Sequence, residues 1–197
     1  MENNEVDNSR RRFLTASATV VGGVGTVAGA VPFISTMTPS AKTKAIGAPV
    51  EVDISKLQPG ERIIEQWQGK PVWILRRTPE MLEDITAQNA EVSDPQSDQS
   101  AQPDYAKNEY RAIEDEYLVV LGICTHLGCS PNFVLKDAES TPAADWKGGF
   151  FCPCHGSRFD LAGRVFKGVP APTNLVVPPY KFISPNRLLI GDDSGAV

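Results

Sequence analysis

The sequence predicts a mainly β protein in which a head of antiparallel strands follows a single N-terminal membrane helix. No charged residue occurs from Phe13 to Ile34, about the 20 residues that a helix needs to cross a bilayer. Later parts of the chain alternate short β-rich runs with turn residues. All four cysteines and both histidines lie in two short segments, residues 124–129 and 152–155, which predicts one shared site.

The N-terminus carries a motif for export. The run S-R-R-R-F-L, residues 9–14, resembles the twin-arginine signal of bacteria. We expect residues 1–12 to form a cytoplasmic tail and residues 13–34 a single-pass anchor in the bacterial inner membrane, with the head in the periplasm. The run A-G-A, residues 28–30, also fits a signal-peptidase site, so release of a soluble protein stays open as an alternative.

The length and the net charge of the chain limit the classes of function that it can have. The 197 residues are enough for one domain with a core and a tail, and the formal net charge is −5. A nucleic-acid-binding surface needs a basic patch, and the sequence contains none. We therefore expect no nucleic-acid partner.

Residues 35–49 are small and polar and have no periodicity, which predicts a flexible tether ahead of a head domain over residues 50–197. Within the head, apolar alternation and β-branched residues predict strands in V-E-V-D-I-S-K-L, I-I-E-Q-W, V-W-I-L, Y-L-V-V-L-G-I, G-F-F-C, L-V-V-P-P-Y-K-F-I and R-L-L-I. The turn residues Q-G-K-P indicate a hairpin between the second and third of these runs.

Residues 79–110 differ from the rest of the head. They begin with a plausible short helix, P-E-M-L-E-D-I-T-A-Q, and continue as S-D-P-Q-S-D-Q-S-A-Q-P-D. The second run is too polar to build a core, so we expect a polar insertion or surface loop.

The cysteines and histidines have the spacing of metal ligands. Each loop follows an apolar strand and supplies one thiolate and one imidazole from the set Cys124, His126, Cys152 and His155. Two thiolates and two imidazoles are a common structural zinc set. Zinc would leave Cys129 and Cys154 unused, although a disulfide between them would join the loops and an exported protein permits it.

The two motifs together, C-T-H-L-G-C and C-P-C-H-G-S, resemble those of the Rieske iron–sulfur proteins, of the kind with a disulfide between the cluster loops. The twin-arginine anchor, the tether, the β head and the run G-V-P-A-P (residues 168–172) further resemble the Rieske subunit of ubiquinol–cytochrome c reductase, the respiratory cytochrome bc complex. The resemblance implies a Rieske-type antiparallel β-sandwich with a cluster-binding subdomain whose loops are residues 124–129 and 152–157.

The resemblance also implies a cofactor, one 2Fe–2S cluster of the Rieske type. Cys124 and Cys152 would bind one iron, and His126 and His155 would bind the other. Cys129 and Cys154 would form the disulfide. Neutral imidazoles in place of thiolates remove negative charge, and they raise the potential to about −150 to +300 mV from about −400 mV in plant-type ferredoxins.

Further roles follow from the resemblance. His155 would be the catalytic imidazole that accepts a proton from quinol, and Leu127, beside Gly128, would belong to the apolar lip that docks at the quinol site. Pro170 and Pro172 would cover the cluster.

Two residues that follow His155 in the sequence, Ser157 and Phe159, should tune the reduction potential of the cluster. Ser157 matches a serine that donates a hydrogen bond to a bridging sulfide. Phe159 stands where many ubiquinol-type members have a tyrosine that donates to a ligand sulfur. We therefore expect a lower potential here than in the tyrosine-bearing members.

The function implied is electron transfer from quinol to a c-type cytochrome, as one subunit of a membrane oxidoreductase. Cytochrome b and a c-type cytochrome would be partners in a dimeric complex that also translocates protons. Two alternatives remain at this point: a soluble periplasmic Rieske carrier or small subunit of an exported oxidoreductase such as arsenite oxidase, and a zinc-stabilised binding module.

Overall fold

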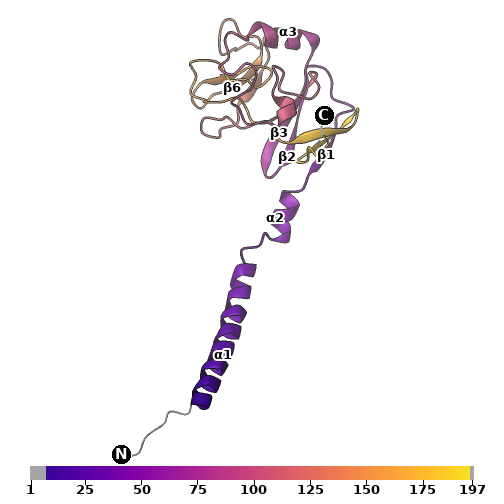
Figure 1. Cartoon of the computed structure of the whole chain (residues 1–197). Coiled ribbons are helices and arrows are strands. Elements are labelled where there is room, and N and C mark those ends of the chain that lie inside the picture. The colour runs from indigo at the N-terminus through magenta and orange to yellow at the C-terminus, as the bar shows by residue number, and fades with distance from the viewer. Residues whose placement is uncertain (1–7, 196–197) are drawn as a thin grey trace, which may run out of the picture. The chain divides into compact units, whose positions relative to one another are not determined.

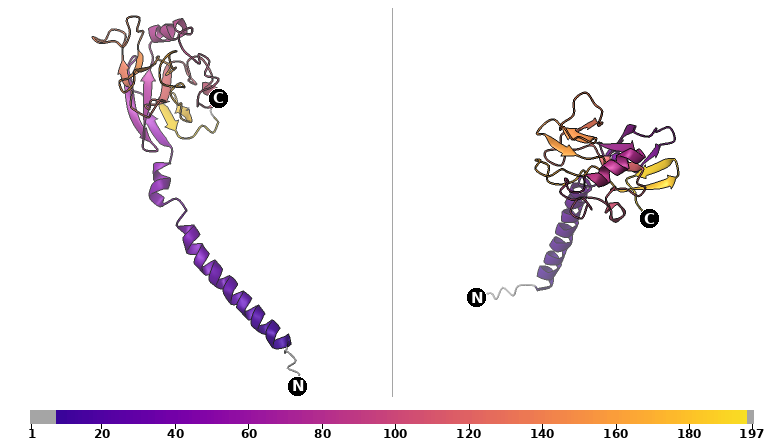
Figure 2. Two further views of the ribbon diagram at one scale, coloured as in Figure 1. Left: turned by 90° about the vertical axis from the view of Figure 1, so that its left-hand side faces the viewer. Right: turned by 90° about the horizontal axis from the view of Figure 1, so that it is seen from above.

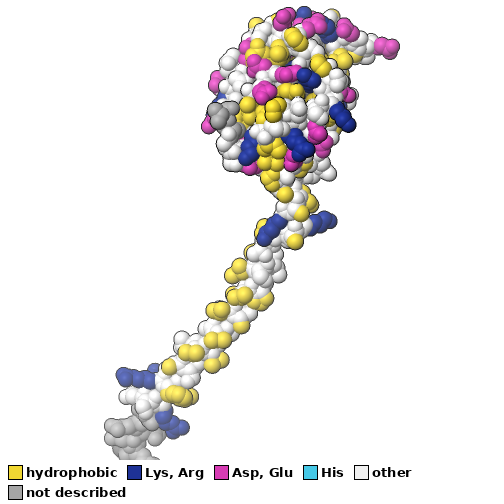
Figure 3. Space-filling model, turned by 90° about the vertical axis from the view of Figure 1, so that its right-hand side faces the viewer, with side chains coloured by type: hydrophobic (Ala, Val, Ile, Leu, Met, Phe, Trp, Pro, Cys, Tyr) yellow, Lys and Arg dark blue, Asp and Glu magenta, His cyan; other side chains and the backbone are white. Residues whose placement is uncertain are grey.

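The computed structural model describes residues 8–195, and the chain divides into two compact units, residues 1–45 and 46–197. The first unit contains helix α1 (Asn8–Ser35) (Figure 1). Within the described residues, α1 is the one helix that is long and apolar enough to cross a membrane. Hydrophobic side chains are exposed along α1 (Figure 3), as expected for a helix whose surroundings are lipid. The predicted anchor over residues 13–34 lies inside this helix.

The predicted tether contains regular structure that its sequence did not indicate. Helix α2 (Ala41–Ile46) occupies part of it, and the Ser40 hydroxyl accepts a hydrogen bond from the N–H of Thr43, 3.2 Å away. A serine in this position caps a helix by satisfying one of its free N–H groups. The lack of periodicity in residues 35–49 thus did not indicate α2, which lies within the predicted tether. Their flexibility stays a prediction.

The head is built from antiparallel strands, as predicted (Figures 1 and 2). Its described residues form three three-stranded sheets with the orders β1-β9-β8, β2-β3-β4 and β5-β6-β7. The strands are β1 (Val50–Asp53), β2 (Arg62–Trp67), β3 (Lys70–Arg76), β4 (Tyr117–Leu121), β5 (Asn132–Val134), β6 (Gly149–Cys152), β7 (Ser157–Phe159), β8 (Tyr180–Ser184) and β9 (Arg187–Ile190).

Several strands follow the sequence pattern, and others do not. The predicted hairpin is β2–β3, which turns at Gln68 and Gly69. The run L-V-V-P-P-Y-K-F-I becomes strand only from Tyr180, because Pro178 and Pro179 lack the N–H that a ladder requires. Strands β5 and β7 contain three residues each, too few to show alternation in the sequence.

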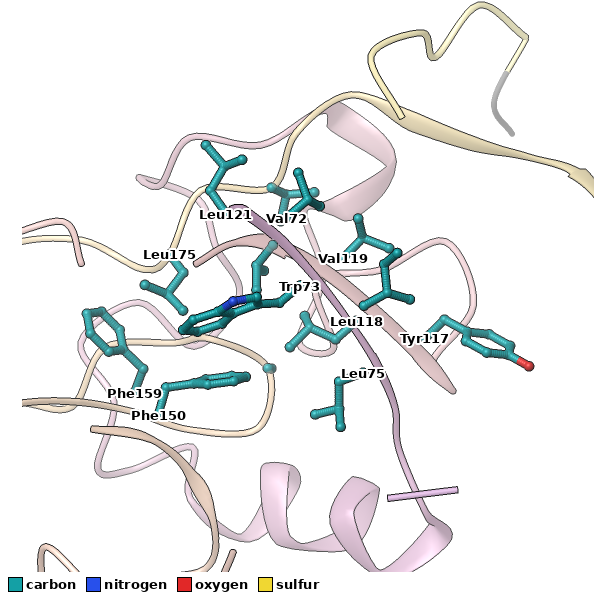
Figure 4. Close-up of a cluster of buried hydrophobic side chains, with 14 of the residues drawn as sticks. Val72, Trp73, Leu75, Tyr117, Leu118, Val119, Leu121, Phe150, Phe159 and Leu175 are labelled. Atoms are coloured by element: carbon teal, nitrogen blue, oxygen red, sulfur yellow. The ribbon is translucent and has the colours of Figure 1, made fainter. Parts of the chain in front are cut away.

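The core joins the second sheet to the third, which carries Cys152. Trp73 of β3 stacks on Phe150 of β6 with ring centroids 5.0 Å apart, and both side chains are buried (Figure 4). Gly122 lies against the Trp73 ring, where a Cβ atom would overlap the indole. Each large buried side chain contributes about 1.5–3 kcal/mol of transfer free energy. Gly122, which lies between β4 and the first cysteine–histidine loop, thus fixes the start of that loop against the core.

Residues 79–110 were expected to form a polar insertion or surface loop, and this expectation is corrected in part, because buried residues of the segment pack within the head. The predicted helix is present as α3 (Pro79–Ala87), whose first turn is capped by the Thr78 hydroxyl. Downstream, Val92 is buried and pairs with Phe166 in an isolated β-bridge. Ala106, in the 3-10 turn η1 (Asp104–Ala106), is also buried.

Several polar groups of this segment are hydrogen-bonded to partners within it and beyond it. Asp94 accepts hydrogen bonds from the N–H groups of Asp98 and Gln99 and from the Ser100 hydroxyl, at 2.8–3.1 Å. The Asn174 side chain donates to the Asp94 carbonyl from 3.1 Å away. A polar segment can be buried when its polar groups are hydrogen-bonded, and these bonds supply that condition.

Gly149 provides a test of the pairing between β6 and β7. Its φ is 142°, and a Cβ atom there would overlap the carbonyl oxygen of Phe159. We expect Gly149→Ala to lower the free energy of unfolding by about 3 kcal/mol through this overlap and the backbone strain. Urea unfolding of the detergent-solubilised chain, followed by circular dichroism, measures the change.

Gly69→Ala is the matched control, since Gly69 has φ 73° but open space around the added Cβ. It should lower the free energy of unfolding by about 1 kcal/mol from backbone strain alone. A loss for Gly149→Ala no larger than that of the control would contradict the proposed overlap.

Candidate metal centre

The two cysteine–histidine loops are closed in the same way. The N–H of Gly128 donates to the carbonyl of Cys124 at 3.0 Å, and the N–H of Gly156 donates to the carbonyl of Cys152 at 2.9 Å. Both glycines adopt left-handed backbone angles, φ 82° and 76°, which other residues adopt only with strain. Gly128, a predicted site residue, thus shapes the loop backbone. Gly156 shapes the backbone of the second loop in the same way. It follows a histidine, as Gly128 does, and this likeness could have identified it as a site residue from the sequence.

A disulfide joins the loops. Cys129 and Cys154 are bonded, with their Cα atoms 6.8 Å apart, which confirms the predicted pairing. The sulfurs of Cys129, Cys154 and Cys152 lie within 4.8 Å of one another. Because the first two are bonded to each other, only Cys152 of this group can offer a thiolate to a metal.

The remaining two thiols are buried side by side. Cys124 and Cys152 are each 2% exposed. Burial raises the pKa of the Cys124 thiol; the main-chain N–H of His126 opposes this rise, the neighbouring Cys152 adds to it, and the Ser157 hydroxyl opposes it. These contacts place both thiols and the Ser157 hydroxyl in one buried space. A metal ion bound there would replace the thiol protons.

The imidazoles form the other side of the site. The rings of His126 and His155 meet edge to face, with centroids 4.7 Å apart and planes at 90°. Nδ1 of His126 is buried and has no hydrogen-bond partner in the described part of the chain. A buried nitrogen without a partner is destabilising, and a bond to iron would satisfy it. Two buried thiols and two adjoining imidazoles fit the ligand set of a 2Fe–2S cluster of the Rieske type.

A third segment, residues 168–173, which contains the run G-V-P-A-P, is hydrogen-bonded to both of the other loops. The Ser157 Oγ accepts a hydrogen bond from the N–H of Ala171 at 3.1 Å, so its own proton is free to point toward the thiols. Thr125 Oγ1 donates to the carbonyl of Thr173 at 2.7 Å. The predicted covering residues Pro170 and Pro172 are exposed and flank Ala171. Thr125 was missed in the sequence, where a threonine between two candidate ligands gives no signal of this contact.

The outer edge of the site is apolar on one side. Leu127 is 71% exposed, although it is a large hydrophobic side chain. His155 is exposed, whereas His126 is partly buried. The two imidazoles therefore differ in their access to another molecule.

Comparison with known proteins agrees with this geometry. Residues 87–181 match the family model of the Rieske [2Fe-2S] domain, and residues 1–40 match the model described as the ubiquitinol–cytochrome c reductase Fe-S subunit TAT signal. The fold and the site thus define a Rieske iron–sulfur protein whose cofactor is a 2Fe–2S cluster. The zinc-stabilised alternative is set aside.

Relatives match the chain over almost its whole length. The ubiquinol–cytochrome c reductase iron–sulfur subunit of Allochromatium vinosum is 53% identical over 97% of this chain and 92% of its own. The subunit of the same name from Bradyrhizobium diazoefficiens is 42% identical over 93% of this chain and 94% of its own. The chain belongs to the family of ubiquinol–cytochrome c reductase iron–sulfur subunits. A solved structure titled hyperthermophilic respiratory Complex III aligns with 89% of this chain and 99% of its own, at 26% identity and a TM-score of 0.48.

Phe159 generates a prediction about the potential. Its ring is fully buried, and its strand β7 pairs with β6 beside Phe150 (Figure 4). We expect Phe159→Tyr to raise the midpoint potential, because a tyrosine hydroxyl can donate a hydrogen bond that stabilises the reduced cluster. A redox titration of the membrane-bound protein measures the potential.

Phe150→Tyr is the control, since it adds the same hydroxyl at another buried ring of the adjoining strand. Phe150→Tyr should leave the midpoint potential unchanged. An unchanged or lower potential in Phe159→Tyr would contradict the prediction.

Proposed function

We propose that this chain is the electron-transfer subunit of a respiratory cytochrome bc complex, which takes an electron from quinol and passes it to a c-type cytochrome. The observation that carries the proposal is the pair of buried thiols beside two imidazoles, one partly buried and one exposed, on loops joined by a disulfide. Relatives that match both the N-terminal helix and the head are named as reductase subunits, so a free-standing periplasmic carrier is not favoured.

The ligand roles follow from the burial of each group. Cys124 and Cys152 would hold one iron through their Sγ atoms. His126 would hold the second iron through the buried Nδ1, and we assign the same atom to His155. A 2Fe–2S cluster held in this way supplies a one-electron acceptor of high potential.

His155 would make the contact with substrate. If Nδ1 bound the iron, the remaining proton of the imidazole would be on Nε2; once Nε2 had released it, this atom could accept a hydrogen bond from the quinol hydroxyl and then the proton. An added electron beside the imidazole would favour proton uptake at Nε2, so the two transfers would favour each other. Leu127 would add apolar contact with the quinol site, because an exposed leucine gains free energy when it is buried against a partner.

The N-terminal helix would place the head on the side of the membrane opposite the arginines. We propose that α1 is a retained anchor in the inner membrane, with the twin-arginine segment cytoplasmic and the head periplasmic. The proton that His155 takes from quinol would then be released outside, which is this subunit's share of proton translocation. Cytochrome b, a c-type cytochrome and a second copy of the complex would be its partners.

Spectroscopy tests the cluster and its ligands together. We expect the ascorbate-reduced membrane protein to give an electron paramagnetic resonance spectrum with the low average g value of a histidine-ligated 2Fe–2S centre. His155→Asn should abolish this spectrum, because it removes an iron ligand, while Ser130→Ala, at an exposed position beside the first loop, should leave it unchanged. Bound zinc in place of iron, or an unchanged spectrum in His155→Asn, would refute the proposal.

The segment between α2 and β1 gives a second test. If the head moves between two partners, Gly47→Pro with Ala48→Pro should slow electron transfer from quinol to cytochrome c by about tenfold, because prolines restrict the backbone. The cluster spectrum should not change. Gly47→Ala with Ala48→Ser is the control, and a turnover equal to that of the control would count against a moving head.

A further inference from the structure

Three arginines are buried in the head. Arg77, Arg111 and Arg164 are 1%, 0% and 0% exposed. Among the charged side chains of residues 8–195 that are buried, only Asp94 and Asp160 carry the opposite sign. The interior thus holds one positive charge in excess, which is a costly arrangement for a protein core.

Two of the arginines have no carboxylate partner. Arg164 pairs with Asp160 at 2.7 Å, but the described residues show no ion pair for Arg77 or Arg111. Arg111 instead donates to the carbonyl of Leu175 at 2.6 Å and to those of Ala162 and Gly163 at 3.3 Å.

Arg77 is held in a similar way. It donates to the carbonyls of Asp115 and Tyr110 at 2.8 Å and to that of Leu161 at 3.4 Å. Carbonyl oxygens orient a guanidinium without cancelling its charge. Because Asp160 is paired with Arg164, only Asp94 among the buried acids of residues 8–195 is left to offset Arg77 and Arg111, and one positive charge remains in excess.

The three guanidiniums converge on one turn of the chain. They contact residues 160–163, directly after β7 (Ser157–Phe159). Strand β7 leads straight out of the loop that carries Cys152 and His155, and Ser157 lies opposite Cys152 in the β6–β7 pair. The buried positive charge thus contacts the turn that β7 connects to the second ligand loop.

Both unpaired arginines are charged at neutral pH. Burial lowers the pKa of Arg111 to about 9 and that of Arg77 to about 10, which still leaves each protonated at pH 7. Arg111 also adopts φ 56°, a strained angle for a residue with a side chain. Such strain persists only where the surrounding contacts fix the residue, and the hydrogen bonds of the Arg111 guanidinium are contacts of that kind.

We propose that Arg111 and Arg77 raise the reduction potential of the cluster by holding net positive charge in the interior of the head, against the turn that follows the second ligand loop and β7. The inference rests on the proposed function, since it needs the cluster in place. A fixed positive charge stabilises whichever redox state carries one more electron, and burial weakens the screening by water and salt. The two arginines act through their field and do not contact the reacting groups.

Redox titration of the full-length membrane protein, followed by the electron paramagnetic resonance signal, tests the proposal. Arg111→Met keeps an unbranched buried chain and removes the charge, so the midpoint potential should fall. The fall should persist at high salt. Arg76→Met is the matched control, because Arg76 is adjacent to Arg77 but partly exposed and paired with Glu116 at 2.6 Å. It should leave the potential unchanged.

A variant that shifts the midpoint potential in the opposite direction distinguishes an electrostatic effect from a loss of structure. Asp94→Asn removes a buried negative charge close enough to Arg111 to act on it electrostatically, and the potential should rise. A merely structural role predicts no such rise. Should Arg111→Met fail to fold, Arg77→Met and Asp94→Asn decide the question by the same opposite shifts.

The outcomes are distinct. Wild-type potentials in the charge-removing variants, with the Rieske spectrum retained, overturn the inference and leave the proposed function intact. Absence of the spectrum from the unaltered protein overturns the proposed function, and the inference with it.

Discussion

The head depends on one constraint: four ligands on two separate loops must lie side by side in a space that excludes water. The Cys129–Cys154 disulfide joins the loops covalently, and each loop is closed on its ligand cysteine by the N–H of a left-handed glycine. Thr125 and Ser157 then tie both loops to residues 168–173. The ligands are thereby ordered by the protein itself, which limits the rearrangement that accompanies a change of redox state.

The rest of the head supports these loops by two different means. Trp73 and Phe150 join the sheet beneath the first loop to the strand that enters the second, through apolar packing. On the other side, Arg164 connects the turn after β7 to α3 and its continuation, through the carbonyls of Ile85 and Pro95. Buried charge there is unfavourable unless it is fully hydrogen-bonded, and the carbonyls supplied by a polar segment meet that condition.

Prediction from sequence succeeded where local pattern decides structure. The hairpin β2–β3 follows from its turn residues, helix α3 from the run P-E-M-L-E-D-I-T-A-Q, and the apolar helix α1 from the absence of charge. Spacing alone left zinc as well as iron open at the cysteine–histidine loops, and the resemblance to Rieske proteins supplied the assignment. The polarity of residues 79–110 suggested a surface loop. This interpretation failed because the hydrogen-bond partners Arg164 and Asn174 lie 75 and 80 residues further along the chain.

The sequence by itself determined the residue types available: two thiols, two imidazoles, a cysteine pair for a disulfide and an uncharged span for a membrane. These are properties of side-chain chemistry and spacing, which need no fold to be read. The tertiary structure decided which thiols are buried, which imidazole is exposed, and that, among residues 8–195, three buried arginines share the interior with two buried acids. Burial and charge balance arise from contacts between segments that are distant in the sequence, so the local sequence pattern does not predict them.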